Sequence, residues 1–455
     1  MGKELFLTTL VLCLLALGSC EVPAPQENAV DAGPERWFWA KDGEDQFYQL
    51  EARELVTGTH SIFYVETANQ DKAPRDAVVA LADEFDTKIF PLITRQFGDF
   101  LDMDQNGKVL FLLLDIRDLP GIGYTAGYFY SGDMYDPSIR EYSNKADMIY
   151  VDINPGNIQE PGVRYNLAHE FQHLVNFSVR QRIGSPQDVW INEGLSSAAE
   201  YLYAGEHLKD RIDFFNDPRT SIPYGNNFYY WNDGLVYGDR GLANYATVYL
   251  FFQWLRIHTA PGKDIYKEIV QSEYGDYRGI TDAAARCFDP PIACDWELLL
   301  QTWLAANYLN EASGLYGYKG ELVTQVFDLP PERPYFIKQA EDPYPLFPGE
   351  AVYSELAGDT LYAAAGNIRY AGLPKSGPVD TDGAYAKGWK LLTFNSNTSL
   401  SPIKIESGRL GEHAAHRSIT APHPERPLPA LHAWEPAAAF PGRHDWFGPV
   451  DAQGK

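Results

Sequence analysis

His169-Glu170-Phe171-Gln172-His173 stands near the middle of the chain, and Glu193 follows within Trp190-Ile191-Asn192-Glu193-Gly194. Residues four apart on a helix share one face, so His169 and His173 are spaced to bind one metal ion together. Glu170 lies one step round that helix, where a carboxylate binds a water on the metal without ligating the metal. Glu193 is expected to be the third ligand. Two imidazoles, one carboxylate and an open fourth position predict a hydrolytic centre with one catalytic Zn2+ ion.

The residues around this motif narrow the class of zinc site. A metzincin needs glycine at position 176 and histidine at position 179, where this chain has Asn176 and Val179. Asn192-Glu193 instead resembles the gluzincin arrangement of thermolysin-like peptidases. In those enzymes an aspartate four residues after the glutamate ligand orients a ligand histidine, and Ser197 occupies that position here. Glu200, further along the same helix face, is one candidate for this orienting role, and a residue elsewhere in the chain is the other.

A longer resemblance covers much of residues 60–320. It runs through residues 126–133, 148–153, 168–177, 190–196, 244–252 and 303–307. These segments resemble the hyicolysin family of zinc metallopeptidases. The resemblance implies a secreted endopeptidase in which His169, His173 and Glu193 bind the metal and Glu170 is the catalytic base.

The expected reaction is hydrolysis of peptide bonds by a zinc-activated water. Glu170 would take the proton of the water during attack and deliver it to the departing amine. The tetrahedral oxyanion needs a second electrophile, which is usually a tyrosine or histidine in gluzincins. Tyr245 is the first candidate and Tyr237 the second, although a packed tyrosine is the alternative for either. His207 and His258 are expected to be structural or surface residues.

The N-terminus predicts export from the cytoplasm. The apolar run from Leu5 to Leu17 is too short to span a bilayer comfortably and indicates a secretory signal. Leu17-Gly18-Ser19-Cys20 resembles the lipobox of bacterial lipoproteins, where cleavage leaves the cysteine as the lipidated N-terminus. An incidental cysteine after a plain signal peptide is the alternative. We therefore expect an extracytoplasmic protein that Cys20 anchors to a bacterial membrane, on the periplasmic side or at the cell surface.

Composition limits the partners. The net charge of −25 argues against nucleic acid and against an anionic membrane surface, and its simplest consequence is solubility. The expected partner is a protein or peptide substrate, with membrane contact through the lipid alone. Cys287 and Cys294 flank Asp289-Pro290-Pro291, and an oxidising compartment makes a local disulfide between them plausible.

The predicted fold class is α+β: an N-terminal subdomain that contains a sheet, a mainly helical subdomain that carries the zinc site, and a small β-rich C-terminal domain. The predicted divisions are a lipoprotein signal peptide at 1–19, a flexible spacer at 20–45, the catalytic domain at 46–323, the β-rich domain at 324–410 and a disordered tail at 411–455.

Periodicity and strand-forming residues locate the main elements. Strands are predicted at 61–65, 110–114, 148–152, 361–363 and 389–394, and helices at 77–98, 163–179, 242–258 and 295–309. Pro91 is expected to kink or split the first of these helices. A further helix is predicted to begin at Asn192 as its N-cap and to stop at Gly205.

Asp102-Met103-Asp104-Gln105-Asn106-Gly107-Lys108-Val109 precedes the predicted strand at 110–114. Its alternating carboxylates suggest calcium binding, but an EF-hand loop needs a bidentate acid at its twelfth position, which is Leu113 here. We favour the alternative, an Asn-Gly turn that leads into a buried strand.

Two other functions compete with a secreted endopeptidase. A surface-anchored binding protein or adhesin could keep a metallopeptidase fold, but it would have no need of Glu170 beside intact ligands. An aminopeptidase would need an acidic anchor for a free substrate N-terminus, and the sequence contains no convincing motif of that kind.

Overall fold

The computed structural model describes residues 33–43, 46–118, 125–225, 240–330, 346, 348–361, 367–375, 378–381 and 383–398. Cys20, Tyr237, the signal segment 1–19 and the tail 411–455 lie outside these residues. No helix in the described part of the chain combines the length and the apolar character that a bilayer-spanning segment needs.

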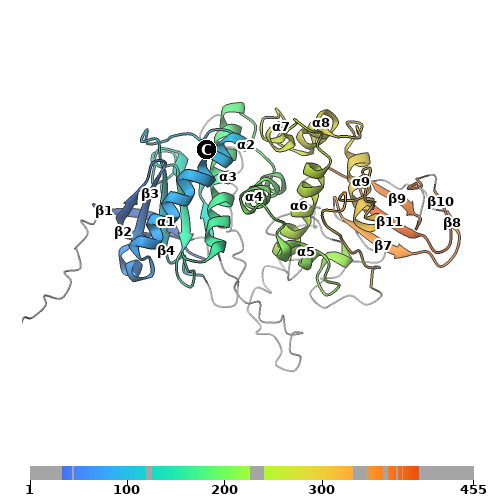
Figure 1. The fold of residues 1–455 in the computed structure, drawn as a ribbon, viewed down its shortest axis with the longest axis horizontal. Helices are drawn as coiled ribbons and strands as arrows, with labels where there is room; N and C mark the ends of the chain where they lie inside the picture. Colours follow the sequence, from blue (N-terminus) through green and yellow to red (C-terminus); the bar gives the residue numbers. More distant parts are fainter. Residues whose placement is uncertain are drawn as a thin grey trace, which may run out of the picture.

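The N-terminal part is built on a six-stranded mixed sheet with the order β1-β2-β3-β4-β6-β5. Figure 1 labels its strands β1 to β4. The strands are β1 Glu35–Lys41, β2 Phe47–Thr57, β3 Ser61–Glu66, β4 Val109–Leu114, β5 Gly127–Phe129 and β6 Met148–Asp152. β3, β4 and β6 are parallel neighbours, and the other pairs are antiparallel. Every residue of β4 and β6 is buried, as is typical of central strands covered on both faces. The strands predicted at 61–65, 110–114 and 148–152 are confirmed.

The first strand corrects one prediction. Composition predicts a flexible spacer over residues 20–45, but Glu35–Lys41 form β1 and pair with β2. Phe38 and Ala40, two residues apart on one face of β1, are buried in the core on that side of the sheet. Burial alternates over residues 37–40, so this segment forms a strand despite the Pro- and Ala-rich composition before it.

Helices cover one face of this sheet (Figure 1). They are α1 Arg75–Glu84, a π-helical turn Phe85–Ile89, α2 Phe90–Phe97 and α3 Pro161–Ile183. Pro91 is the second residue of α2, and the π-helical turn lies directly before this helix. The helix predicted at 77–98 is therefore divided close to Pro91, as expected.

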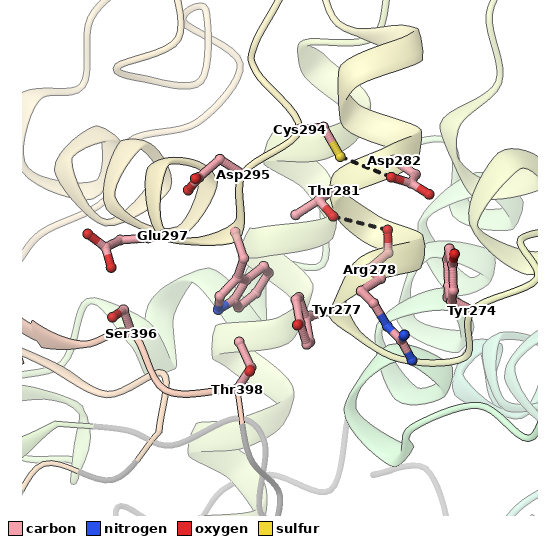
Figure 2. Close-up of a pocket in the computed structure, with 11 residues that line it drawn as sticks. Tyr274, Tyr277, Arg278, Thr281, Asp282, Cys294, Asp295, Glu297, Ser396 and Thr398 are labelled. Atoms are coloured by element: carbon pink, nitrogen blue, oxygen red, sulfur yellow. Dashed lines mark hydrogen bonds between the residues drawn. The ribbon is translucent and has the colours of Figure 1, made fainter. Parts of the chain in front are cut away.

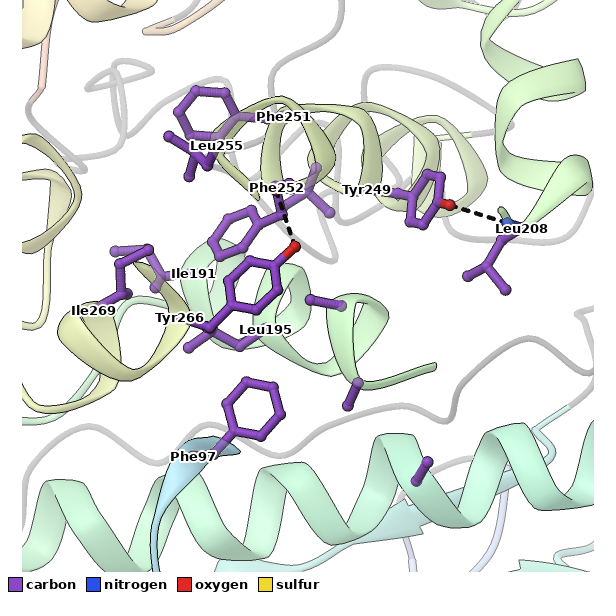
Figure 3. Close-up of a cluster of buried hydrophobic side chains, with 14 of the residues drawn as sticks. Phe97, Ile191, Leu195, Leu208, Tyr249, Phe251, Phe252, Leu255, Tyr266 and Ile269 are labelled. Carbon is purple, nitrogen blue, oxygen red and sulfur yellow. Dashed lines mark hydrogen bonds between the residues drawn. The ribbon is translucent and has the colours of Figure 1, made fainter. Parts of the chain in front are cut away.

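A second group of helices continues the chain beyond α3. It comprises α4 Val189–Ala204, α5 Lys209–Phe215, α6 Arg240–Ile257, α7 Ile265–Val270, α8 Tyr277–Cys287 and α9 Trp296–Leu309. Figure 3 shows the apolar contact between α4, α6 and α7, where Ile191 and Leu195 meet Phe252 and Tyr266. The Tyr266 hydroxyl donates a hydrogen bond to the Phe252 carbonyl at 3.0 Å. α4 also packs against α3, so it lies between α3 and α6.

A small sheet completes the described chain. β7 Ala351–Glu355, β11 Lys390–Asn395 and β9 Ile368–Leu373 form it in that order, and β8 Thr360–Leu361 pairs with β10 Ala384–Tyr385. The Tyr353 hydroxyl of β7 donates to the Leu304 carbonyl of α9 at 2.8 Å. Leu392 and Phe394 of β11 share the core of the helical region. The predicted C-terminal β structure is thus present and packs on α9, while the boundary at 323/324 stays a prediction.

Cys287 and Cys294, the two cysteines among the described residues, are free thiols, so the local disulfide expected between them is not formed. Cys287 is buried at the end of α8, whereas Cys294 is exposed and donates from Sγ to Asp282 Oδ1 at 2.9 Å. Cys294 lines a hollow of about 490 Å³ together with residues of α8, α9 and the segment after β11 (Figure 2). None of the predicted metal ligands lines this hollow.

Candidate metal centre

Two adjacent helices carry the predicted metal ligands. α3 supplies His169 and His173, and α4 supplies Glu193. Gly184, in the left-handed region at φ 77°, ends α3 and lets the chain reverse toward α4. The arrangement expected from sequence, a histidine pair on one helix facing a carboxylate from the next, is therefore the arrangement observed.

The start of α4 differs from the prediction. Asn192 is predicted as the N-cap, but α4 begins at Val189 with Asp188 before it, and this places Glu193 in the second helical turn. Asn192 is buried, and its side-chain amide lies 2.6 Å from His173 Nδ1. It also accepts a hydrogen bond from the Asn176 amide. The Asn192 side chain therefore contacts α3 and does not cap α4.

The three side chains converge on one point. Glu193 Oε2 lies 3.5 Å from His169 Nε2 and 3.7 Å from His173 Nε2. All three ligand atoms lie within 4.8 Å of one another. Tetrahedral zinc with bonds of about 2.0–2.1 Å places its ligand atoms about 3.3 Å apart. The cluster therefore has the size and the donor set to hold one metal ion.

Burial sets the charge state of this cluster. Burial lowers the pKa of His169 and of His173 well below the usual value, which keeps both imidazoles in the neutral form that binds metals. Burial, and then the negative charge of Glu170, raises the pKa of Glu193 well above its usual value. Glu170 itself is fully buried. Two carboxylates in so dry a site favour a bound cation between them.

Each histidine is oriented through its second ring nitrogen. Glu200 Oε1 lies 2.7 Å from His169 Nδ1, so Glu200 occupies the orienting position that the sequence left open. Ser197 is buried on the same helix, and its hydroxyl makes no hydrogen bond to any described residue. On the other histidine, Ser196 Oγ lies 3.0 Å from His173 Nδ1. Such contacts fix the ring with Nε2 turned toward the cluster.

Tyr245 of α6 reaches the same centre. Its ring centroid lies 6.3 Å from that of His169, and its hydroxyl hydrogen-bonds to Glu193. Burial, and then the charges of Glu193 and Glu170, raises the pKa of Tyr245 well above its usual value, so the hydroxyl keeps its proton. The first candidate for the oxyanion donor is therefore in the cluster.

Arg211 is a residue of the centre that the sequence does not predict. It lies on α5 and is only 3% exposed. Its guanidinium pairs with Asp210 at 3.2 Å, its charge acts on Glu200, and its Cζ lies 5.2 Å from the Tyr245 ring centroid. Nothing in Lys209-Asp210-Arg211 distinguishes it from a surface charge, so no sequence signal would have found it.

His207 and His258 stand apart from the cluster, in agreement with the sequence. His258 is buried, and its Nε2 lies 2.9 Å from the Gly317 carbonyl. His207 Nδ1 lies 3.0 Å from the Tyr249 hydroxyl. Both therefore support local packing.

Comparison with known proteins agrees with this centre. No protein-family profile matches the chain. The chain is similar to neutral metalloprotease ShpI of Staphylococcus hyicus, with 36% identity over 251 residues. The match covers 53% of this chain and 55% of that protein, so the chain spans about half the length of the relative it matches. This identity, together with the His169, His173 and Glu193 cluster, supports a metallopeptidase family.

Proposed function

We propose that this protein is a zinc-dependent endopeptidase that hydrolyses peptide bonds of extracytoplasmic proteins or peptides. The observation that carries the proposal is the convergence of His169, His173 and Glu193, with Glu170 buried beside them. The similarity to a neutral metalloprotease supports the same reaction class.

Zinc is the metal that best fits two neutral imidazoles and one carboxylate. When bound, it lowers the pKa of a water ligand toward about 7 and polarises the scissile carbonyl. His169, His173 and Glu193 would hold the ion, and Glu200 and Ser196 keep the two rings in place.

The proton moves through Glu170. Its carboxylate accepts the proton of the attacking water and then donates it to the leaving amine. The Tyr245 hydroxyl, which burial keeps protonated, donates a hydrogen bond to the oxygen that becomes negative. Arg211 supplies a positive charge behind Glu200 and Tyr245.

The proposed location is outside the cytoplasm, with a lipid on Cys20 as the anchor. Support comes from the sequence: a short apolar run ending in Leu17-Gly18-Ser19-Cys20. Labelling with a radioactive fatty acid tests the anchor, because Cys20→Ser would then lose the label.

The reaction is tested by measuring casein cleavage and bound zinc for the purified chain and for Glu170→Gln. Glu170→Gln should keep one zinc per chain and lose at least about a hundredfold in activity, since only the proton carrier is removed. The control Glu160→Gln makes the same chemical change at an exposed site before α3 and should cleave normally. Equal proteolysis by wild type and Glu170→Gln would sink the assignment. If the chain binds no zinc and shows no chelator-sensitive cleavage, a surface-anchored binding protein is favoured. If substrates instead lose residues one at a time from their N-termini, an aminopeptidase is favoured.

A further inference from the structure

A second group of carboxylates lies on the N-terminal sheet, away from the histidine cluster. Asp102 and Asp104 belong to the loop between α2 and β4, and Asp147 directly precedes β6. One oxygen from each carboxylate can be chosen so that all three lie within 4.8 Å of one another. Loop and strand thus bring Asp147 next to two acids that come much earlier in the sequence.

The sheet explains this meeting. β4 and β6 are parallel neighbours, with Leu110 opposite Met148, so the residues just before the two strands lie side by side. The Leu110 amide donates to the Asp147 carbonyl at 3.0 Å. An EF-hand loop would take its last acid from position 113, but Leu113 is buried in β4. Asp147 supplies a carboxylate to the loop from the adjacent strand instead.

The loop itself is a tight turn, as the sequence predicts. Gln105 and Gly107 have positive φ, at 60° and 73°. The backbone amides of Asn106 and Gly107 donate to Asp102 at 3.0 and 2.9 Å. These bonds hold the Asp102 carboxylate over the turn. They explain the shape of the loop but not the position of Asp147.

Asp147 provides the independent observation. Its side chain is buried, with the residue only 1% exposed, and Oδ1 accepts the Met103 amide at 2.9 Å. Oδ2 is also buried, and no described residue donates a hydrogen bond to it. A buried carboxylate oxygen without a donor is costly unless a cation compensates it. Burial, and then the negative charge of Asp104, raises the pKa of Asp147 to about 7.

The positively charged side chains near these carboxylates, Lys108 and Arg36, do not neutralise them. Lys108 turns its ammonium group away, to the carbonyls of Gly58 and Thr59. Arg36 acts on Asp104 only as a minor opposing charge, after burial, the Asn106 amide and Asp102. Three carboxylates therefore converge with little positive charge of the protein's own to balance them.

We propose that Asp102, Asp104 and Asp147 bind one Ca2+ ion and thereby join the α2–β4 loop to the start of β6. All-oxygen ligands from this turn and from the start of β6 suit this hard cation, whereas zinc prefers nitrogen and sulfur donors. The same loop follows Leu101, whose amide donates to Ser178 Oγ of α3 at 2.9 Å. The ion would therefore stabilise the scaffold under the histidine helix without entering the chemistry, and the inference does not rest on the proposed function.

Equilibrium dialysis of the purified, zinc-loaded full chain against radioactive Ca2+ tests this site. Wild type should bind one Ca2+ per chain at concentrations up to about 5 mM, the range of weak extracellular calcium sites. Asp104→Asn and Asp147→Asn should each weaken binding at least about tenfold, because each replaces an anionic ligand. Asp71→Asn, which removes an exposed charge at the other end of β3, should bind as wild type does. Zinc content should stay the same in all four proteins.

Two results would overturn the proposal: no stoichiometric Ca2+ in wild type, or equal binding by wild type and the Asp104 and Asp147 variants. Mg2+ that binds as tightly as Ca2+ would overturn the choice of ion. Asp104 is exposed, so Asp104→Asn gives an answer even if Asp147→Asn fails to fold.

Discussion

Glu200 Oε1 lies 2.7 Å from His169 Nδ1, so the carboxylate that orients the first motif histidine comes from the helix that also supplies Glu193. Thermolysin-like enzymes resemble this arrangement but place the acid four residues after the glutamate ligand, where this chain has Ser197. Glu200 lies three residues beyond Ser197, on the same side of α4. One helix therefore provides both the proposed third ligand and the acid that orients His169.

Replacing Glu200 with glutamine should weaken the centre without unfolding it. Glutamine can still accept the Nδ1 proton of His169, but it cannot ionise. The Glu200 carboxyl, whose pKa burial raises to about 8, strengthens the histidine as a ligand when it is ionised. We expect about a 10- to 100-fold loss of zinc affinity or of proteolytic activity. Zinc retention against a competing chelator and casein cleavage measure the two quantities. Ser197→Ala is the control: the serine hydroxyl has no hydrogen-bond partner among the described residues, so both quantities should stay near wild type. Equal losses in the two variants would remove the special role of Glu200.

Tyr245→Phe should separate catalysis from metal binding. The variant removes only the hydroxyl that hydrogen-bonds to Glu193. If this hydroxyl also serves the oxyanion, kcat should fall about 10- to 1000-fold while KM and bound zinc change little. Tyr249→Phe, one turn further along α6, is the matched control. Its hydroxyl accepts the Leu208 amide at 2.9 Å, away from the cluster, so this variant should lose some stability but keep its kcat. If Tyr245→Phe instead loses zinc while its kcat per bound zinc is unchanged, Tyr245 only supports Glu193 as a ligand.

The parts of the site that sequence predicted are those in which local spacing determines geometry. The spacing of His169 and His173 places both rings on one helix face. Gly184 ends α3 and Gly205 ends α4, the two helices that carry the predicted ligands. Asn192 shows where local rules fail: its capping propensity is real, but tertiary contact with His173 uses the amide instead.

Other parts depend on contacts that no sequence spacing encodes. Arg211 reaches Glu200 because α5 packs on α6, and Asp147 reaches Asp102 because β6 pairs with β4. In the sequence, neither residue differs from an ordinary surface charge; only the fold places each one at its site. The β1 strand is a third case, since pairing with β2 stabilises a segment that composition alone would leave unstructured.

Gly194 should prove essential to the packing that positions Glu193. A methyl group built on Gly194 would lie 2.2 Å from the buried Phe252 ring, so α4 and α6 can approach only with glycine there. Gly194→Ala should cost about 1–3 kcal/mol of unfolding free energy through overpacking. Gly241→Ala, in the first turn of α6 with no atom within 4 Å of the added methyl group, should be neutral or slightly stabilising. Urea denaturation compares the two, and a Gly194→Ala protein as stable as wild type would contradict the close contact.

His258 should make the fold sensitive to acid. Burial lowers the pKa of His258 from 6.5 to about 4, so below pH 6.5 the unfolded chain binds a proton that the folded chain does not. Stability from this residue is therefore fully present above pH 6.5 and is lost as the pH falls toward 4. His258→Gln keeps a donor for the Gly317 carbonyl but cannot be protonated. Between pH 7 and pH 4.5 the wild type should lose about 2 kcal/mol more unfolding free energy than His258→Gln. Urea denaturation of the two proteins with zinc removed measures this difference, since metal release would otherwise add its own pH dependence. Parallel losses of stability over this range would show that His258 does not control the acid response.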